Sequence, residues 1–152
     1  MTLTLGEVFE KAKKLPNNTE RSAWLRKHAG PGMYYLLKIA FQDPTWLLPE
    51  GAPPFKRDVG ADKGAGLTPS HLLRELRTFY LFFQGGNPGL NQLRREKLFQ
   101  GVLERLDNQE IALVLSLKDK SFTKDYRVTR NLVDQTFPGL LQTPFTTKFL
   151  RG

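Results

Sequence analysis

The chain contains no cysteine and only two histidines among its 152 residues. The absence of cysteine excludes disulfide bonds and thiolate metal sites. The two histidines, His28 and His71, lie far apart in the sequence and are a weak basis for a zinc site. We therefore expect neither a metal nor a cofactor.

Long apolar runs are also missing. No run reaches the roughly 18 residues that a membrane-spanning helix needs. The first residues lack the basic segment and the apolar segment of a signal peptide. These two absences predict a soluble, intracellular protein.

Motifs of nucleotide and acyl-transfer chemistry are absent as well. The sequence has no Gly-x-x-x-x-Gly-Lys-Ser/Thr loop, no Gly-x-Ser-x-Gly elbow and no Lys-x-Asp-Gly. Its 15 acidic residues offer many carboxylate pairs, but none stands in a distinguishing context. We predict that the protein is not an enzyme.

Positive charge is present in excess. The chain has 23 Lys and Arg against 15 Asp and Glu, a formal net charge of +8 and a pI near 9.9. Such an excess suits a polyanionic partner, although it can also serve solubility alone. With 152 residues, 39% of them hydrophobic, the chain is long enough and apolar enough to fold around one ordinary core.

Apolar residues recur at three- and four-residue spacing along most of the chain, which is typical of amphipathic helices. We predict an all-α single domain of about seven helices in two lobes. The first lobe spans 1–42 and the second 68–138. An irregular, Pro/Gly-rich connection spans 43–67, and an apolar tail spans 139–152. The tail either docks onto the domain or presents a hydrophobic strip.

The centre of the predicted fold is a helix pair around the turn 84–89. Thr68 and Pro69 suit the cap and first position of a helix that continues to Phe83. A second amphipathic helix runs to Leu106, and Asp107 and Glu110 then form the capping box of a short, strongly apolar helix, as Thr4 and Glu7 do for the first helix of the chain. Residues 118–127 form a polar, mostly basic loop, and a last helix follows Thr129.

The pattern of residues 67–141 resembles the α-helical N-terminal DNA-binding domain of ATP-dependent DNA ligases, especially those of phages. The shared features are the Gly-Gly-Asn turn, the apolar helix of residues 110–117 and Thr129-x-x-Leu-Val-x-x-x-Phe-Pro-Gly-Leu140. Most of the chain is also similar to small tailed-phage proteins with no established activity. They share Leu47-Leu-Pro-Glu-Gly-Ala-Pro-Pro-Phe55, Gly85-Gly-Asn-Pro88 and Arg94-Arg-Glu96.

The ligase resemblance implies a helical domain that grips duplex DNA through Gly85, Gly86, Asn87, Thr129 and Arg130. The chain departs from that family at Lys118-Asp119-Lys120-Ser121-Phe122, where the ligases have a small residue followed by glycine. The phage resemblance implies the cytoplasm of an infected bacterium, or the virion, as the location.

Basic side chains near these positions complete the candidate nucleic-acid site. The same residues can equally form solvated helix faces and an ordinary polar loop, and the glycine turn can simply stop a helix. The added candidates are Arg94, Arg95, Lys97, Lys118, Lys120, Lys124 and Arg127.

Two functions are therefore open at this point. The first is a non-catalytic phage accessory protein that binds the duplex DNA backbone without sequence specificity. The alternative is an adaptor, a host-enzyme inhibitor or a virion component. Its phage or host protein partner would bind the strap from Trp46 to Phe55 or the tail from Leu140 to Leu150.

Overall fold

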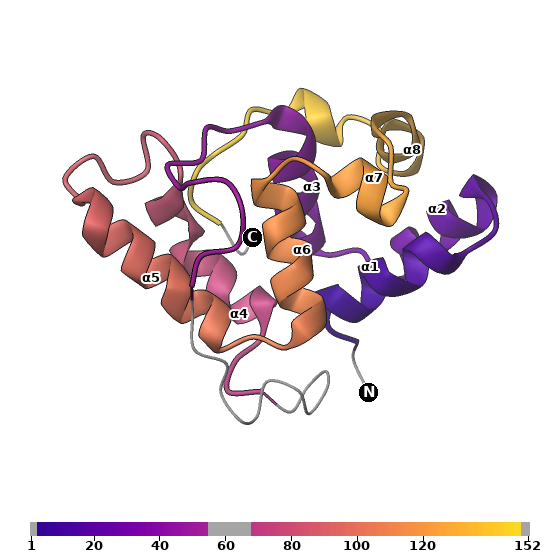
Figure 1. The fold of residues 1–152 in the computed structure, drawn as a ribbon. Helices are drawn as coiled ribbons and strands as arrows, with labels where there is room; N and C mark the ends of the chain where they lie inside the picture. Colours follow the sequence, from indigo (N-terminus) through magenta and orange to yellow (C-terminus); the bar gives the residue numbers. More distant parts are fainter. Residues whose placement is uncertain (1–2, 55–67, 150–152) are drawn as a thin grey trace.

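The computed structural model describes residues 3–54 and 68–149, and within them it is all-α (Figure 1). The described part contains eight α-helices and two short 3₁₀ helices, which confirms the predicted fold class. None of these helices is long and apolar enough to cross a bilayer. In chain order the elements are α1 (Leu5–Lys14), α2 (Asn18–Lys27), α3 (Pro31–Gln42), α4 (Leu72–Glu75), η1 (Leu76–Phe82), α5 (Gln92–Glu104), α6 (Asn108–Lys118), α7 (Phe122–Tyr126), α8 (Arg130–Thr136) and η2 (Leu140–Gln142).

Helix α6 lies at the centre of the molecule (Figure 1). Helix α1 packs against α6 and α7, α2 packs against α8, and α3 packs against α6 and η2. The segments expected to form two lobes therefore interleave around one hydrophobic core. This packing brings the N-terminal helices next to the C-terminal ones.

The segment from Thr68 to Phe83 is not one α-helix, because α4 begins only at Leu72 and has a single turn. The hydroxyl of Thr68 bonds to the carbonyl of Ser70 and does not cap a helix. From Leu76 the chain continues as the 3₁₀ helix η1. Residues three apart then lie on one line, and Leu76, Phe79 and Phe82 are all fully buried.

The strap docks onto the helices as far as the structure describes it, that is, to residue 54. The Leu47 amide donates to the carbonyl of Phe82 at 2.8 Å, and the Gln84 amide donates to Thr45 at 2.9 Å. The Trp46 ring meets Phe83 edge to face, with centroids 4.6 Å apart. Phe55 and the predicted loop 56–66 lie outside the described residues.

The tail docks as well, which settles the alternative left open by the sequence. The Tyr35 hydroxyl donates to the carbonyl of Thr147 at 2.5 Å, and the Gln42 amide donates to Thr143 at 2.6 Å. The rings of Phe145 and Phe149 pack against Tyr35. Neither strap nor tail is a free apolar strip along its described length.

Candidate nucleic-acid interface

The segment that follows α6 folds into a compact corner and is not the loop that the sequence predicted. Phe122 and Tyr126 of α7 are buried, and their rings lie 5.4 and 6.1 Å from that of Phe9 in α1. Four-residue spacing places both rings on one face of the short helix. The outer face of α7 carries Lys124, which is exposed.

Two backbone turns shape this corner. The Ser121 amide bonds to the Ser116 carbonyl at 3.0 Å, which ends α6 in a Schellman motif with Lys120 in the left-handed conformation (φ 62°). Arg127 ends α7 in the same conformation (φ 59°). Thr129 then caps α8 by accepting from the Leu132 amide at 3.1 Å, as predicted.

Five basic side chains gather at these turns, and we call them the basic corner. Lys13 of α1 belongs to it because its ammonium lies 5.9 Å from the centre of the Tyr126 ring. Arg130 donates to the carbonyl of Phe41 at 3.1 Å. The members of the basic corner are Lys13, Lys120, Lys124, Arg127 and Arg130.

Two aspartates lie beside the cations of the basic corner, and each is bonded to a neighbouring group. Asp43 pairs with Lys120. Burial alone would raise the pKa of Asp125, but hydrogen bonds from Ser121 and Ser116 and the charges of Lys124 and Lys13 hold it below its usual range. Within the described residues, neither Lys124 nor Arg127 makes a side-chain hydrogen bond or ion pair.

The left-handed backbone of Lys120 and Arg127 is unusual, because glycine is the residue that normally occupies such positions. A non-glycine residue there costs about 1 kcal/mol. Both side chains are exposed, so core packing does not explain the choice. The lysine and arginine side chains at these positions place positive charge on the surface, although the backbone there is strained.

The turn 84–89 and α5 hold a second group of the predicted site residues. Gly86 is required by packing, since an added Cβ would lie 1.7 Å from the Tyr80 carbonyl oxygen. Gly85 is exposed and has positive φ, and the side chain of Asn87 accepts from the Gly89 amide. Arg94 and Lys97 are exposed on α5. The missing side chain of Gly86 therefore lets the turn pack closely against the Tyr80 carbonyl of its own chain.

Two predicted contacts, Arg95 and Lys118, are buried and so fail the expectation of exposed cations. Arg95 is 6% exposed and bonds to the carbonyls of Leu81 and Leu90 and to Gln92. Its guanidinium thus joins η1 and the turn to α5. The rigid fork of arginine suits several backbone carbonyls at once.

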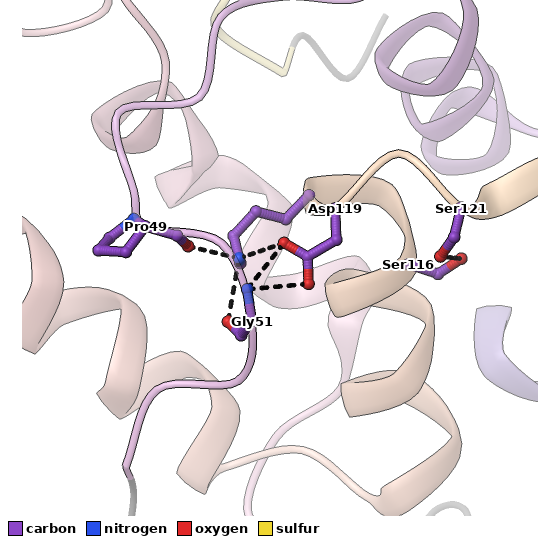
Figure 2. A network of polar contacts seen from close by, with 6 residues as sticks. Pro49, Gly51, Ser116, Asp119 and Ser121 are labelled. Atoms are coloured by element: carbon purple, nitrogen blue, oxygen red, sulfur yellow. Dashed lines mark hydrogen bonds and ion pairs between the residues drawn. The ribbon is translucent and has the colours of Figure 1, made fainter.

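Lys118 fixes the strap to the end of α6. Its ammonium donates to Pro49 at 2.7 Å, to Gly51 at 3.1 Å and to Asp119 at 2.6 Å. The Gly51 amide returns a bond to each oxygen of the Asp119 carboxylate, and Figure 2 shows this closed network. All three donors of the ammonium are used within the protein.

The structure does not bring the predicted residues onto one face. Helix α5 lies on one side of α6, and α7 and α8 lie on the other (Figure 1). Lys120, Lys124, Arg127, Thr129 and Arg130 form one group, and the turn with α5 forms a separate one. Lys13 was missed because only tertiary packing places it there. The apolar stripe of α1 predicts that Phe9 is buried, but it does not predict that Phe9 packs against Phe122 and Tyr126 of α7.

The described residues contain no group of three or more His, Asp or Glu side chains placed to hold a metal ion. Searches of curated proteins and of solved structures found no match. One family model matches residues 8–124, from α1 into α7. Because this match spans most of the chain, the protein belongs to the family of unknown function DUF6433.

Proposed function

We propose that the protein binds the phosphate backbone of duplex DNA through the basic corner, without sequence specificity and without catalytic activity. The observation that carries this proposal is the convergence of five cations from three helices and two turns. Two of them, Lys124 and Arg127, make no side-chain hydrogen bond or ion pair in the part of the chain that the structure describes. Exposed cations that are not held in an ion pair are the groups that bind phosphates and release condensed counterions.

The shape of the basic corner suits backbone contact more than base reading. Helix α7 has only five residues and α8 has seven, so neither offers a long recognition helix for the major groove. Lysine and arginine contacts to phosphates position a protein but carry no sequence information. The resemblance of residues 67–141 to ligase DNA-binding domains supports duplex DNA as the target.

The biological setting belongs to the same proposal. The resemblance to small tailed-phage proteins supports an accessory role on DNA in the cytoplasm of an infected bacterium. The docking of the strap to residue 54 and of the tail to residue 149 supports this role over the rival role as an adaptor, which called for a free apolar strip.

The test is fluorescence anisotropy of a labelled short duplex titrated with the protein at several salt concentrations. We expect log K to fall with log[salt] at a slope of about −0.9 per neutralised phosphate, with roughly four to six phosphates neutralised. The double variant Lys124→Glu/Arg127→Glu should weaken binding at least about tenfold and reduce the slope by about 2.

A matched control reverses two positive charges in the second group of predicted site residues, the turn 84–89 with α5. The double variant Arg94→Glu/Lys97→Glu changes two exposed cations of α5, and we expect it to alter affinity by less than about threefold, through long-range charge only. Equal losses in the two variants would show that net charge alone drives binding. No binding by the wild type at roughly 50 mM salt would refute the proposal altogether.

A further inference from the structure

An open hollow of about 540 Å³ lies beside α4 and η1, away from the basic corner. In Figure 1, α4 lies on the other side of α6 from α7 and α8. Among the described residues, the hollow is lined by Leu73, Arg74, Arg77 and Phe149. Its volume falls in the range of small-molecule pockets, so a group of the size of a nucleotide fits.

The lining carries two positive charges and, among the described residues, no negative one. Arg74 and Arg77 are exposed and lie three residues apart along consecutive helical turns, which makes their side chains neighbours. Neither guanidinium makes a hydrogen bond or ion pair within the described residues. The acid between them in the sequence, Glu75, is buried and already bonded to Arg105 and Ser70. Because a guanidinium stays charged and can only donate, the hollow fits an anionic acceptor.

A third cation stands beside η1. Arg77 and Tyr80 are three residues apart in this 3₁₀ helix, so their side chains lie on one line. The ammonium of Lys148 lies 5.3 Å from the centre of the Tyr80 ring. Lys148 is exposed, and its side chain makes no hydrogen bond or ion pair within the described residues. Positive charge therefore continues along η1 beyond the hollow.

Apolar surface accompanies these charges. Leu73 is 43% exposed, and the ring of Phe149 packs against Tyr35 at 5.2 Å while it also lines the hollow. A partner that uses the whole hollow brings together negative charge and a flat apolar face. Single-stranded nucleic acid offers both, and proteins bind it through basic grooves that carry aromatic side chains. In a duplex the faces of the bases are covered by stacking.

We propose that this hollow binds single-stranded nucleic acid, with phosphates at Arg74 and Arg77 and a base against Phe149 and Leu73. Lys148 contacts a neighbouring phosphate. The site shares no residue with the basic corner, so this proposal does not rest on duplex binding there.

The first test is the binding of a short labelled oligothymidylate, which does not pair with itself. We expect Arg74→Glu/Arg77→Glu to weaken it at least about tenfold and to reduce the salt slope by about 1.4, since two phosphate contacts to a single strand are lost. The same variant should change duplex affinity by less than about threefold. If the duplex does not bind at all, the single-strand measurement still decides this proposal.

A charge-matched control uses α5. Arg94→Glu/Lys97→Glu reverses two exposed cations that do not line the hollow. We expect it to alter oligothymidylate binding by less than about threefold, through long-range charge only. Both double variants change exposed side chains and should keep the melting temperature of the wild type.

The second test separates the base from the phosphates. An abasic strand of the same length keeps every phosphate but has no base to stack, and we expect it to bind at least about fivefold more weakly. Phe149→Leu keeps an apolar side chain beside Tyr35 but removes the aromatic face. It should weaken oligothymidylate about fivefold and leave the abasic strand unchanged, whereas a purely structural role of Phe149 would change both strands alike.

Three results would overturn the proposal. One is the absence of oligothymidylate binding at roughly 50 mM salt, where counterion release favours it. Another is a loss in Arg74→Glu/Arg77→Glu no larger than that in the α5 control. The third is equal binding of oligothymidylate, the abasic strand and an acidic peptide of the same charge, which would mean that the hollow takes any polyanion.

Discussion

Lys118 and Lys120 lie two residues apart at the end of α6, yet their side chains do opposite things. The Lys118 side chain is 2% exposed and makes three bonds inside the protein. The Lys120 side chain is 54% exposed on a left-handed backbone and pairs only with Asp43, itself exposed. The difference shows that the surroundings, and not the residue type, decide whether a cation is structural or free to bind.

The same contrast separates the charged residues of α6 from those of the segment that follows it. Glu110 near its start and Lys118 at its end are buried and bonded to other segments, whereas the basic corner that follows is exposed. The buried charges should therefore control stability and the exposed ones should control binding. Three experiments test that division.

The largest effect is expected for Lys118→Met. The change leaves the carbonyls of Pro49 and Gly51 and the carboxylate of Asp119 without their shared donor. Removing one partner of a buried ion pair costs about 3 kcal/mol or more, and the partial exposure of Asp119 keeps the expected loss near about 3. Urea unfolding followed by tryptophan fluorescence measures it.

A second readout of the same variant separates structure from binding. We expect DNA affinity at a temperature where the variant is folded to change by less than about threefold, since Lys118 is not part of the basic corner. A loss of affinity as large as that of Lys124→Glu/Arg127→Glu would break the division. Lys97→Met, an exposed lysine of α5, is the matched control and should leave stability within about 0.5 kcal/mol.

The pH dependence of stability tests Glu110. Burial is the main cause that raises its pKa from 4.5 to about 7, and the charges of Asp107 and Glu7 add to it, although the amides of Leu72 and Gly6 oppose the rise. Between these two values the folded state binds more protons than the unfolded state. Stability from this group is therefore fully present below pH 4.5 and is lost as the pH rises through about 7.

The magnitude follows from the size of that pKa shift. We expect the free energy of unfolding to fall by about 2 to 3 kcal/mol between pH 5 and pH 8 through Glu110 alone. Glu110→Gln should flatten the curve by that amount because it removes the titrating group, although its one oxygen can accept from only one of the two amides that Glu110 binds with separate oxygens, so its stability should be lower at every pH. A variant curve parallel to that of the wild type would show that Glu110 does not titrate in this range.

The sequence predicted those parts of the fold that depend on local rules. The capping box of Thr4 and Glu7 is present in full, and Thr129 caps α8. At Asp107 only half of the expected box forms: its side chain accepts from the Glu110 amide, while the Glu110 side chain leaves its own helix to bond α1 and α4. That choice depends on packing between segments about 40 and 100 residues apart, which no local pattern contains.

The candidate site was predictable only in part for the same reason. Residue type identified the cations near the glycine turn and around α7, but it could not separate Arg95 and Lys118 from their exposed neighbours. Spacing hinted at the burial of Arg95, which lies four residues before the fully inward Phe99. For Lys118 the partner is the strap, and its place follows from Trp46 packing against Phe83.

The smallest effect, with the opposite sign, is expected at Arg127. Its backbone is left-handed, and its side chain has no hydrogen bond or ion pair within the described residues. Arg127→Ala and Arg127→Gly remove the same charge, but only glycine relieves the strained backbone. We expect the glycine variant to be about 1 kcal/mol more stable than the alanine variant and at least as stable as the wild type.

The DNA affinities of these variants should not follow the order of their stabilities. Both variants lose one phosphate contact, so both should show the same reduction in DNA affinity and a salt slope smaller by about 1. A glycine variant that is more stable and binds more weakly would mean that the chain keeps arginine there for its charge despite the strain. Unchanged binding in both variants would remove Arg127 from the interface and leave its strained backbone as a structural feature of the α7–α8 turn alone.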